Sequence, residues 1–141
     1  ERDERIKRLA GKIDRVLVDA PCSGLGTLRR NPDLKWRQSE KAVAELVLKQ
    51  TAILDSAARL VKPGGRLVYA TCSVLPQENE EIAQAFSRAH PDFVPLNVAE
   101  ALARLKVDGA DALCAQDGQF LRLWPHRHAT DGFFAALWVR K

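Results

Sequence analysis

The stretch V-L-V-D-A-P-C-S-G, residues 16–24, is a short apolar run that ends in a carboxylate, with a cysteine three residues later behind a proline. Such a run flanked by charge is typical of a buried strand, and we predict a strand over residues 15–18. The stretch L-V-Y-A-T-C-S, residues 67–73, repeats the arrangement about fifty residues later. A second strand is predicted over residues 66–71, so each strand has a cysteine just beyond its carboxyl end.

Two helices are predicted on either side of the second strand. Ser39 is a suitable N-cap, and apolar residues recur at helical spacing from Val43 to Val61. We expect this helix to end at K-P-G-G, residues 62–65, because proline cannot continue it and glycine accepts a left-handed turn. The second helix is predicted from about Pro76 to Ala89, with glutamates at positions 78, 80 and 81 in its first turns, where the helix dipole favours negative charge.

The rest of the chain carries weaker signals. We expect a strand over residues 93–98, a short helix or turn over 99–105 and a loop over 108–118. Residues 120–124 and 133–139 are apolar and aromatic enough for strands, and P-H-R-H-A-T-D-G between them predicts a hairpin-like connection. The predicted fold class is therefore α/β, with a mainly parallel sheet, a right-handed crossover and a terminal antiparallel strand pair.

The composition favours a single domain. The chain has 141 residues, of which 46% are hydrophobic, and its formal net charge of +4 permits a polyanionic partner without requiring one. Three cysteines without compact spacing, and no apolar signal segment, predict a reducing, cytoplasmic setting. No apolar run approaches the roughly 20 residues that cross a bilayer. Because the chain starts at Glu1 and contains no methionine, we expect it to be a piece of a longer protein.

Asp19, Cys22 and Cys72 are the candidate catalytic residues. Neighbouring parallel strands lie about 4.8 Å apart, and sites form beyond their carboxyl ends. If the two predicted strands are neighbours, both thiols and the carboxylate face one pocket. A thiolate is a strong nucleophile, suited to attack on an electron-poor carbon.

Other interpretations of the cysteines stay open at this point. A free cysteine is more often a small buried hydrophobic residue, which is our interpretation of Cys114. A zinc site is disfavoured, and no metal is predicted, because there is no C-x-x-C and because Cys22, Cys72 and His126 have no clustered ligand spacing. A redox pair would need the two α-carbons within about 7 Å.

Three ordered motifs resemble one protein family. They are D-A-P-C-S-G-x-G at residues 19–26, Y-A-T-C-S-x-x-P-x-E-N-E at 69–80 and R-L-W-P-H-R-H-x-T-D-G-F-F at 122–134. Together they resemble the Sun-type (Fmu-like) RNA 5-methylcytosine methyltransferases, above all the bacterial members that modify small-subunit (16S) ribosomal RNA. The resemblance implies a Rossmann-like domain that uses S-adenosylmethionine.

The resemblance also implies a role for each candidate. Cys72, the cysteine of the T-C motif, would attack carbon 6 of a cytosine. This attack would make carbon 5 an enamine-like electron donor that takes the methyl group. Cys22 would help to remove the carbon 5 proton or to release the covalent product. Asp19 would contact the cofactor and the cytosine ring edge, and Pro21 would join it at the cofactor. The residues alone do not decide which thiol attacks.

A basic loop after Cys22 is the candidate RNA-binding surface. It offers phosphate-binding charge around one aromatic ring, on Arg29, Arg30, Lys35, Trp36 and Arg37. The alternative is a solvated loop with the tryptophan tucked into the core. His126, Arg127 and His128 would either line the pocket for RNA or hold the terminal hairpin. A target base must leave its stack, which costs least in single-stranded or looped RNA.

Part of the family pattern is absent. The chain has no G-x-G-x-x-G cofactor loop after the first strand and no acidic residue after the second, and G-L-G at residues 24–26 has the wrong spacing. We therefore expect the C-terminal half of a methyltransferase domain, with its first strands missing and with residues 15–18 at an unpaired sheet edge. Such a piece would bind cofactor weakly, turn over nothing and be prone to self-association.

Two other functions compete with this interpretation. A non-catalytic RNA-binding or assembly module would keep the basic loop but would have no use for two thiols at strand ends. An amino-group methyltransferase is disfavoured, because its N-P-P-Y-type stretch supplies a ring to stack the base and D-A-P-C does not.

Overall fold

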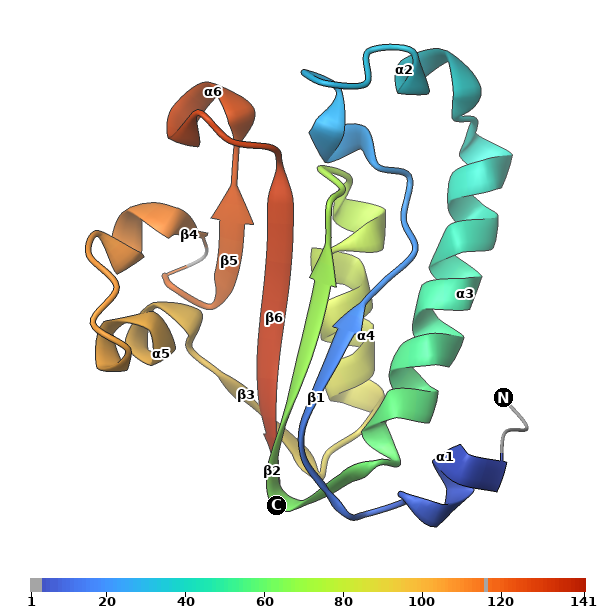
Figure 1. Cartoon of the computed structure of the whole chain (residues 1–141), viewed down its shortest axis with the longest axis vertical. Helices are drawn as coiled ribbons and strands as arrows, with labels where there is room; N and C mark the ends of the chain where they lie inside the picture. Colours follow the sequence, from blue (N-terminus) through green and yellow to red (C-terminus); the bar gives the residue numbers. More distant parts are fainter. Residues whose placement is uncertain (1–3, 116) are drawn as a thin grey trace.

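The computed structural model describes residues 4–115 and 117–141 and consists of one sheet with helices packed against it (Figure 1). Its strands are β1 Ile13–Asp19, β2 Val61–Thr71, β3 Phe93–Leu96, β4 Cys114–Ala115, β5 Phe120–Leu123 and β6 Phe133–Arg140. Its α-helices are α1 Glu4–Arg8, α2 Leu34–Arg37, α3 Glu40–Ala58, α4 Glu80–Ala89, α5 Val98–Arg104 and α6 Pro125–His128. Short 3₁₀ helices are η1 Leu25–Thr27, η2 Pro76–Glu78 and η3 Ala110–Leu113.

The sheet has the strand order β1-β2-β6-β5-β4, and β3 also pairs with β6. β1 and β2 are parallel, with Val16 opposite Leu67. The β2–β6, β3–β6, β4–β5 and β5–β6 pairs are antiparallel. The predicted α/β class and the terminal antiparallel pair are confirmed. Among the described residues the sheet is mixed rather than mainly parallel, because β6 returns beside β2 and the short α6 connection joins it to β5 as a hairpin.

Helix α3 begins where the sequence predicts and ends earlier. The Ser39 hydroxyl accepts a hydrogen bond from the Ala42 amide at 3.1 Å, which confirms the N-cap. The helix ends at Ala58, and Val61 is the fully buried first residue of β2 rather than the last apolar position of the helix. Residues 62–65 therefore lie within β2, where the pairing with β1 shifts register between Ile13 and Arg15.

The remaining elements agree with the predicted order. α4 begins at Glu80, after the 3₁₀ turn η2, instead of at Pro76. The predicted loop over residues 108–118 contains η3 and the short strand β4, and Gln116 within it lies outside the described residues. The connection between β5 and β6 is a helical turn, α6, that ends at Ala129 in the left-handed conformation, with φ 53°.

The core lies between the sheet and helices α3 and α4, which cover the same face (Figure 1). Leu54 of α3 and Phe86 of α4 pack in one cluster with Leu67, Tyr69 and Trp138 of the sheet. Among the described residues, no helix is long and apolar enough to span a membrane.

β1 is the outermost strand at one end of this sheet. Its successive side chains alternate between the core and the opposite, exposed face. Val18 faces the core and is 5% exposed, whereas Leu17 points to the other face and is 67% exposed. The predicted edge at residues 15–18 is therefore confirmed for the described chain.

Candidate active site

The carboxyl ends of β1 and β2 lie side by side. Asp19 is opposite Ala70 in the parallel register, and the Ala20 amide donates a 2.9 Å hydrogen bond to the Ala70 carbonyl. The chain leaves β1 toward Cys22 and leaves β2 directly at Cys72, so both cysteine-bearing turns emerge at the same edge of the sheet. This arrangement follows from the parallel pairing that the two similar sequence stretches predict.

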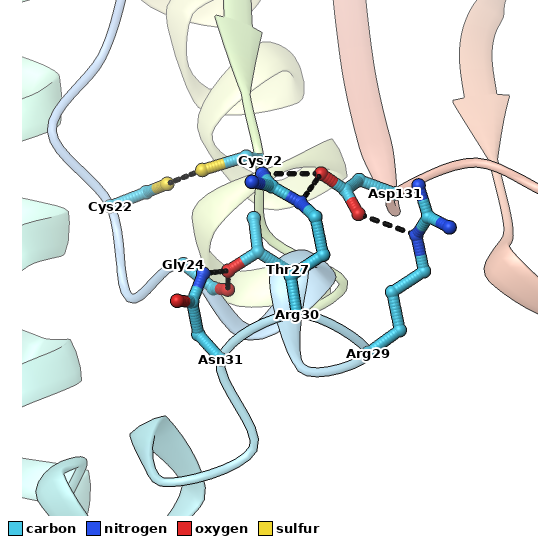
Figure 2. A network of polar contacts seen from close by, with 8 residues as sticks. All are labelled: Cys22, Gly24, Thr27, Arg29, Arg30, Asn31, Cys72 and Asp131. Atoms are coloured by element: carbon cyan, nitrogen blue, oxygen red, sulfur yellow. Dashed lines mark hydrogen bonds and ion pairs between the residues drawn. The ribbon is translucent and has the colours of Figure 1, made fainter.

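The two sulfur atoms are in contact. Cys22 Sγ and Cys72 Sγ lie 3.3 Å apart, with the two side chains pointing toward each other (Figure 2). Both cysteines are half-buried and free, with no disulfide between them. The predicted convergence of the two thiols is therefore confirmed, and neither sulfur is sealed inside the hydrophobic core.

The sulfur–sulfur hydrogen bond separates the pKa values of the two thiols. It lowers the pKa of Cys72 to about 7, although burial and the negative charges of Asp19 and Glu78 act in the opposite direction. The same hydrogen bond, followed by burial, raises the pKa of Cys22. A thiol donating to a thiolate is the arrangement that produces these opposite shifts. The direction of these shifts favours Cys72 as the thiol that supplies the thiolate.

Asp19 and Pro21 lie on the segment that leads from β1 to Cys22. Both residues are exposed, and among residues 4–115 and 117–141 no hydrogen bond or ion pair engages the Asp19 carboxylate. Asp19 lies opposite Ala70, two residues before Cys72, and its negative charge acts on the Cys72 thiol. The Pro21 carbonyl accepts a 3.0 Å hydrogen bond from Gln50 of α3, so the backbone of the turn is fixed while the Asp19 side chain is open to a ligand.

The third motif joins the first two at Gly26. The Gly26 amide donates to the Cys72 carbonyl at 2.8 Å, and the Gly132 amide donates to the Gly26 carbonyl, also at 2.8 Å. Gly26 thus lies between the turn after β2 and the segment that leads into β6. The three stretches are far apart in sequence and form one hydrogen-bonded rim around the thiols.

An acidic residue of the third motif organises the start of the basic loop. Asp131 binds the Arg29 guanidinium at 2.7 Å and the Arg30 guanidinium at 2.6 Å (Figure 2). Hydrogen bonds from Arg30 and then from Arg29 lower the pKa of Asp131. Asp131 in turn raises the pKa of Arg30, and the charge of the Cys72 sulfur makes a smaller contribution in the same direction. Arg29 and Arg30 are consequently held as exposed cations on either side of Asp131 (Figure 2).

The rest of the basic loop forms the short helix α2, in which Lys35, Trp36 and Arg37 are exposed. Trp36 is 81% exposed, so the interpretation that its ring is tucked into the core is wrong. The Lys35 ammonium lies 4.7 Å from the centre of the Trp36 ring, and Arg37 pairs with Asp33 at 2.7 Å. α2 therefore presents an aromatic face flanked by cations to solvent.

The histidines of the third motif differ from one another. His128 fixes the terminal hairpin, because its Nδ1 accepts from the Trp124 amide and its Nε2 lies 2.8 Å from the Ala112 carbonyl. His126 and Arg127 are exposed, and the His126 ring lies 6.0 Å from the Trp124 ring. A role in RNA binding stays a prediction for all three residues, and the contacts of His128 favour the structural alternative.

A family model described as 16S rRNA methyltransferase RsmB/F matches residues 2–139. The chain belongs to this family. It is 44% identical over 124 residues to a probable ribosomal RNA small subunit methyltransferase B from Synechocystis, a match that covers 88% of this chain and 26% of the relative. It is 45% identical over 123 residues to the probable methyltransferase B of Bacillus subtilis, covering 87% and 26%. The chain thus spans about a quarter of the length of these relatives.

A solved structure supports the fold. NSun6 from Pyrococcus horikoshii, solved with SFG, superposes with a TM-score of 0.74 at 26% identity, covering 96% of this chain and 32% of that one. The predicted RNA methyltransferase family and the α/β class are therefore confirmed.

Sequence reasoning missed one part of this RsmB/F-type site. Glu78 lies in η2, outside α4, and its side chain is fully buried, so the helix-dipole interpretation is wrong for this residue. It binds both serines that follow the cysteines, Ser23 and Ser73. The available signal was the serine repeated after each cysteine, in P-C-S and T-C-S, together with the glutamate a few residues later.

Proposed function

We propose that this chain is the C-terminal half of the catalytic domain of an S-adenosylmethionine-dependent RNA cytosine-C5 methyltransferase that acts on 16S ribosomal RNA. The observation that carries the proposal is the 3.3 Å contact between Cys22 and Cys72 beyond two neighbouring parallel strands, with Asp19 at the same site. Membership of the RsmB/F family supports the RNA substrate and the reaction.

Cys72 is the nucleophile in this mechanism. Its lowered pKa supplies thiolate at neutral pH, and a soft thiolate adds well to carbon 6 of a cytosine. The new S–C6 bond pushes the electron pair of the C5–C6 double bond toward carbon 5, which thereby becomes nucleophilic. Bound S-adenosylmethionine would supply the electrophilic methyl group that carbon 5 takes. Arg30, which pairs with Asp131, interacts favourably with the Cys72 thiolate through its charge, and this interaction is weaker than its ion pair with Asp131.

Cys22 and Asp19 complete the reaction. After methylation, carbon 5 must lose a proton, the C5–C6 double bond must re-form and the S–C6 bond must break, which returns Cys72 as thiolate. In the free protein Cys22 lies against Cys72 as a protonated thiol. Once the Cys72 sulfur is bonded to carbon 6 it is no longer a thiolate, so Cys22 can ionise, and the Cys22 thiolate takes the carbon 5 proton or assists product release. Asp19 carries the carboxylate that bonds the edge of the cytosine ring as its charge is redistributed.

The residues present fit one side of a cofactor site. Asp19 is an open carboxylate at a strand end, next to the exposed Pro21, and it can accept hydrogen bonds from a cationic or hydroxylated ligand. SFG, which accompanies NSun6 in its solved structure, is an analogue of S-adenosylmethionine. The remaining contacts would come from the part of the relatives that this chain does not span, so the isolated chain would bind the cofactor weakly and be inactive.

The basic loop is the RNA-binding surface in this proposal. Arg29 and Arg30 offer phosphate contacts where they pair with Asp131, while Trp36, which is 81% exposed, offers a ring for stacking, with Lys35 and Arg37 as its neighbours. His126 and Arg127 add an exposed basic turn, α6, in the connection between β5 and β6. Two thiols in contact also require a reducing compartment to stay free, which fits the cytoplasm, where ribosomal RNA is modified.

The alternative, a non-catalytic RNA-binding or assembly module, accounts for the exposed basic loop alone. It gives no reason for a thiol pair whose pKa values are driven apart, or for an open carboxylate next to it. The catalytic proposal accounts for all of these features.

Covalent trapping tests the proposal in the complete methyltransferase that contains this chain. Cys72→Ala should abolish the covalent adduct with a 16S rRNA transcript on a denaturing gel, whereas Cys22→Ala should accumulate it. The assay is run at about pH 9, where Cys72 is ionised even without Cys22. Cys114→Ala is the matched control and should behave as the unmodified protein. An adduct that persists in Cys72→Ala would refute the assignment.

A further inference from the structure

Glu78 is a buried carboxylate directly beneath the thiol pair. Its side chain is fully buried, and the described residues place no Lys or Arg in an ion pair with it. Burying a carboxylate without a cation is costly unless hydrogen bonds replace its hydration. A group kept in such a place calls for a specific explanation.

Four donors satisfy this carboxylate. Oε1 accepts from the Ser23 amide at 2.8 Å and from Gln50 Nε2 at 3.0 Å. Oε2 accepts from the Ser23 hydroxyl at 2.6 Å and from the Ser73 hydroxyl. Four acceptor sites are the capacity of a carboxylate, so the arrangement is complete. Removing Glu78 would leave several buried donors without an acceptor.

The two serines are the residues that follow the two cysteines. Ser23 follows Cys22 on the turn from β1, Ser73 follows Cys72 on the turn from β2, and their hydroxyls lie 3.2 Å apart. Both serines are buried. One carboxylate therefore binds the neighbour of each thiol and fixes the distance between two turns that are separated by fifty positions in the chain.

Further hydrogen bonds fix the turn that carries Glu78. The Tyr69 hydroxyl, which is buried in the core, donates at 2.6 Å to the carbonyl of Glu78. Asn79 binds Thr71 and the Ser73 carbonyl on the other side of the same turn. Glu78 is thus fixed by its backbone as well as by its side chain, as a positioning group must be.

We infer that Glu78 is a positioning residue that holds the Cys22 and Cys72 sulfurs in contact by binding Ser23 and Ser73. The inference rests on the proposed function, because the contact it maintains is the one that supplies the nucleophile. Glu78 does not touch the reacting atoms.

The pKa of Cys72 distinguishes a positioning role of Glu78 from an effect of its negative charge. The Cys22 thiol and a backbone hydrogen bond favour the Cys72 thiolate, whereas burial and the charges of Asp19 and Glu78 disfavour it. The charge of Arg30 attracts the thiolate more weakly. If Glu78 acted through its charge alone, removing it would lower the pKa of Cys72. If it acts by positioning, removing it separates the sulfurs and the pKa of Cys72 rises toward that of an ordinary cysteine.

The experiment measures the pKa of Cys72 in the complete methyltransferase, from the pH dependence of iodoacetamide labelling of the peptide that carries it. Glu78→Ala and Ser73→Ala are compared with Glu81→Ala, an exposed glutamate on α4. We expect the first two substitutions to raise the pKa by about one unit or more, toward about 8.5, and the control to leave it unchanged. Ser73→Ala removes one hydroxyl and no charge. If Glu78→Ala does not fold, the Cys72 pKa in Ser73→Ala tests the positioning role on its own.

A folded Glu78→Ala or Ser73→Ala protein whose Cys72 pKa is unchanged or lower would overturn the inference. A second readout is methylation of the 16S transcript, where loss of positioning should lower kcat and leave KM for RNA unchanged. The labelling needs neither RNA nor S-adenosylmethionine. The labelling can therefore contradict the positioning role of Glu78 while Cys72→Ala still abolishes the adduct. Conversely, it can support that role while an adduct that persists in Cys72→Ala refutes the nucleophile.

Discussion

A β-carbon at Gly26 would lie 2.5 Å from the carbonyl oxygen of Cys72. It would also lie 2.3 Å from the carbonyl oxygen of Gly132, so backbone blocks the space on two sides. The close approach lets the Gly26 amide bond Cys72 while its carbonyl accepts from Gly132. Glycine is needed at this position for lack of room.

Gly26→Ala should therefore destabilise the chain and displace the turn that carries Cys72. Overpacking against rigid backbone predicts a loss of about 3 kcal/mol in the free energy of unfolding. Gly64→Ala is the control, because its φ of 76° carries conformational strain but its β-carbon meets nothing within 4 Å. Urea unfolding measures both substitutions. An equal loss of unfolding free energy in the two variants would mean that the lack of room at Gly26 does not make its substitution more costly.

The thiol pair predicts a pH dependence with a definite sign. The Cys22 hydrogen bond lowers the pKa of Cys72 to about 7, so the Cys72 thiolate persists to lower pH than in an ordinary cysteine and is lost as the pH falls through 7. In Cys22→Ala this bond is absent, and the midpoint of Cys72 labelling should rise toward about 8.5. Cys22→Ser keeps a hydrogen-bond donor, so the midpoint of Cys72 labelling should rise less in this variant. An unchanged midpoint in Cys22→Ala would show that the sulfur contact does not tune Cys72.

Local sequence signals were sufficient for the elements that create the site. The apolar runs that end at Asp19 and Thr71 identify two strands, and Ser39 identifies the start of α3, because period and capping are properties of neighbouring residues. The parallel pairing then brings Cys22 and Cys72 together with no further information. The convergence of the thiols was therefore predictable.

Long-range contacts were not predictable in the same way. Glu78 looks like a helix-opening glutamate in sequence, and only the fold places it beneath both serines. The position of β6 between β2 and β5 depends on pairings between distant segments, so the polarity of the sheet could not be inferred from local pattern. The exposure of Trp36 likewise depends on α2 standing away from the core.

That exposure leads to a prediction for RNA binding. Trp36→Ala should change the free energy of unfolding by no more than about 0.5 kcal/mol, since the ring contributes little to the core. If the ring stacks on a base, the affinity of the complete methyltransferase for a 16S transcript should fall by about 1–3 kcal/mol. Filter binding at fixed salt measures this, and Trp36→Phe should retain most of the affinity. Unchanged affinity in Trp36→Ala would exclude the stacking role.

The edge strand leads to a prediction for self-association. β1 pairs only with β2 among the described residues, and Leu17 is 67% exposed on it, so the chain offers an apolar strand edge to a second copy. Leu17→Lys should shift the purified chain toward monomer in sedimentation equilibrium, because a lysine on the strand opposes edge pairing. Leu48→Lys is the matched control, since Leu48 is 72% exposed but lies on α3, away from that edge. If both substitutions dissociate the chain equally, the association depends on general surface hydrophobicity and the β1 edge is not its site.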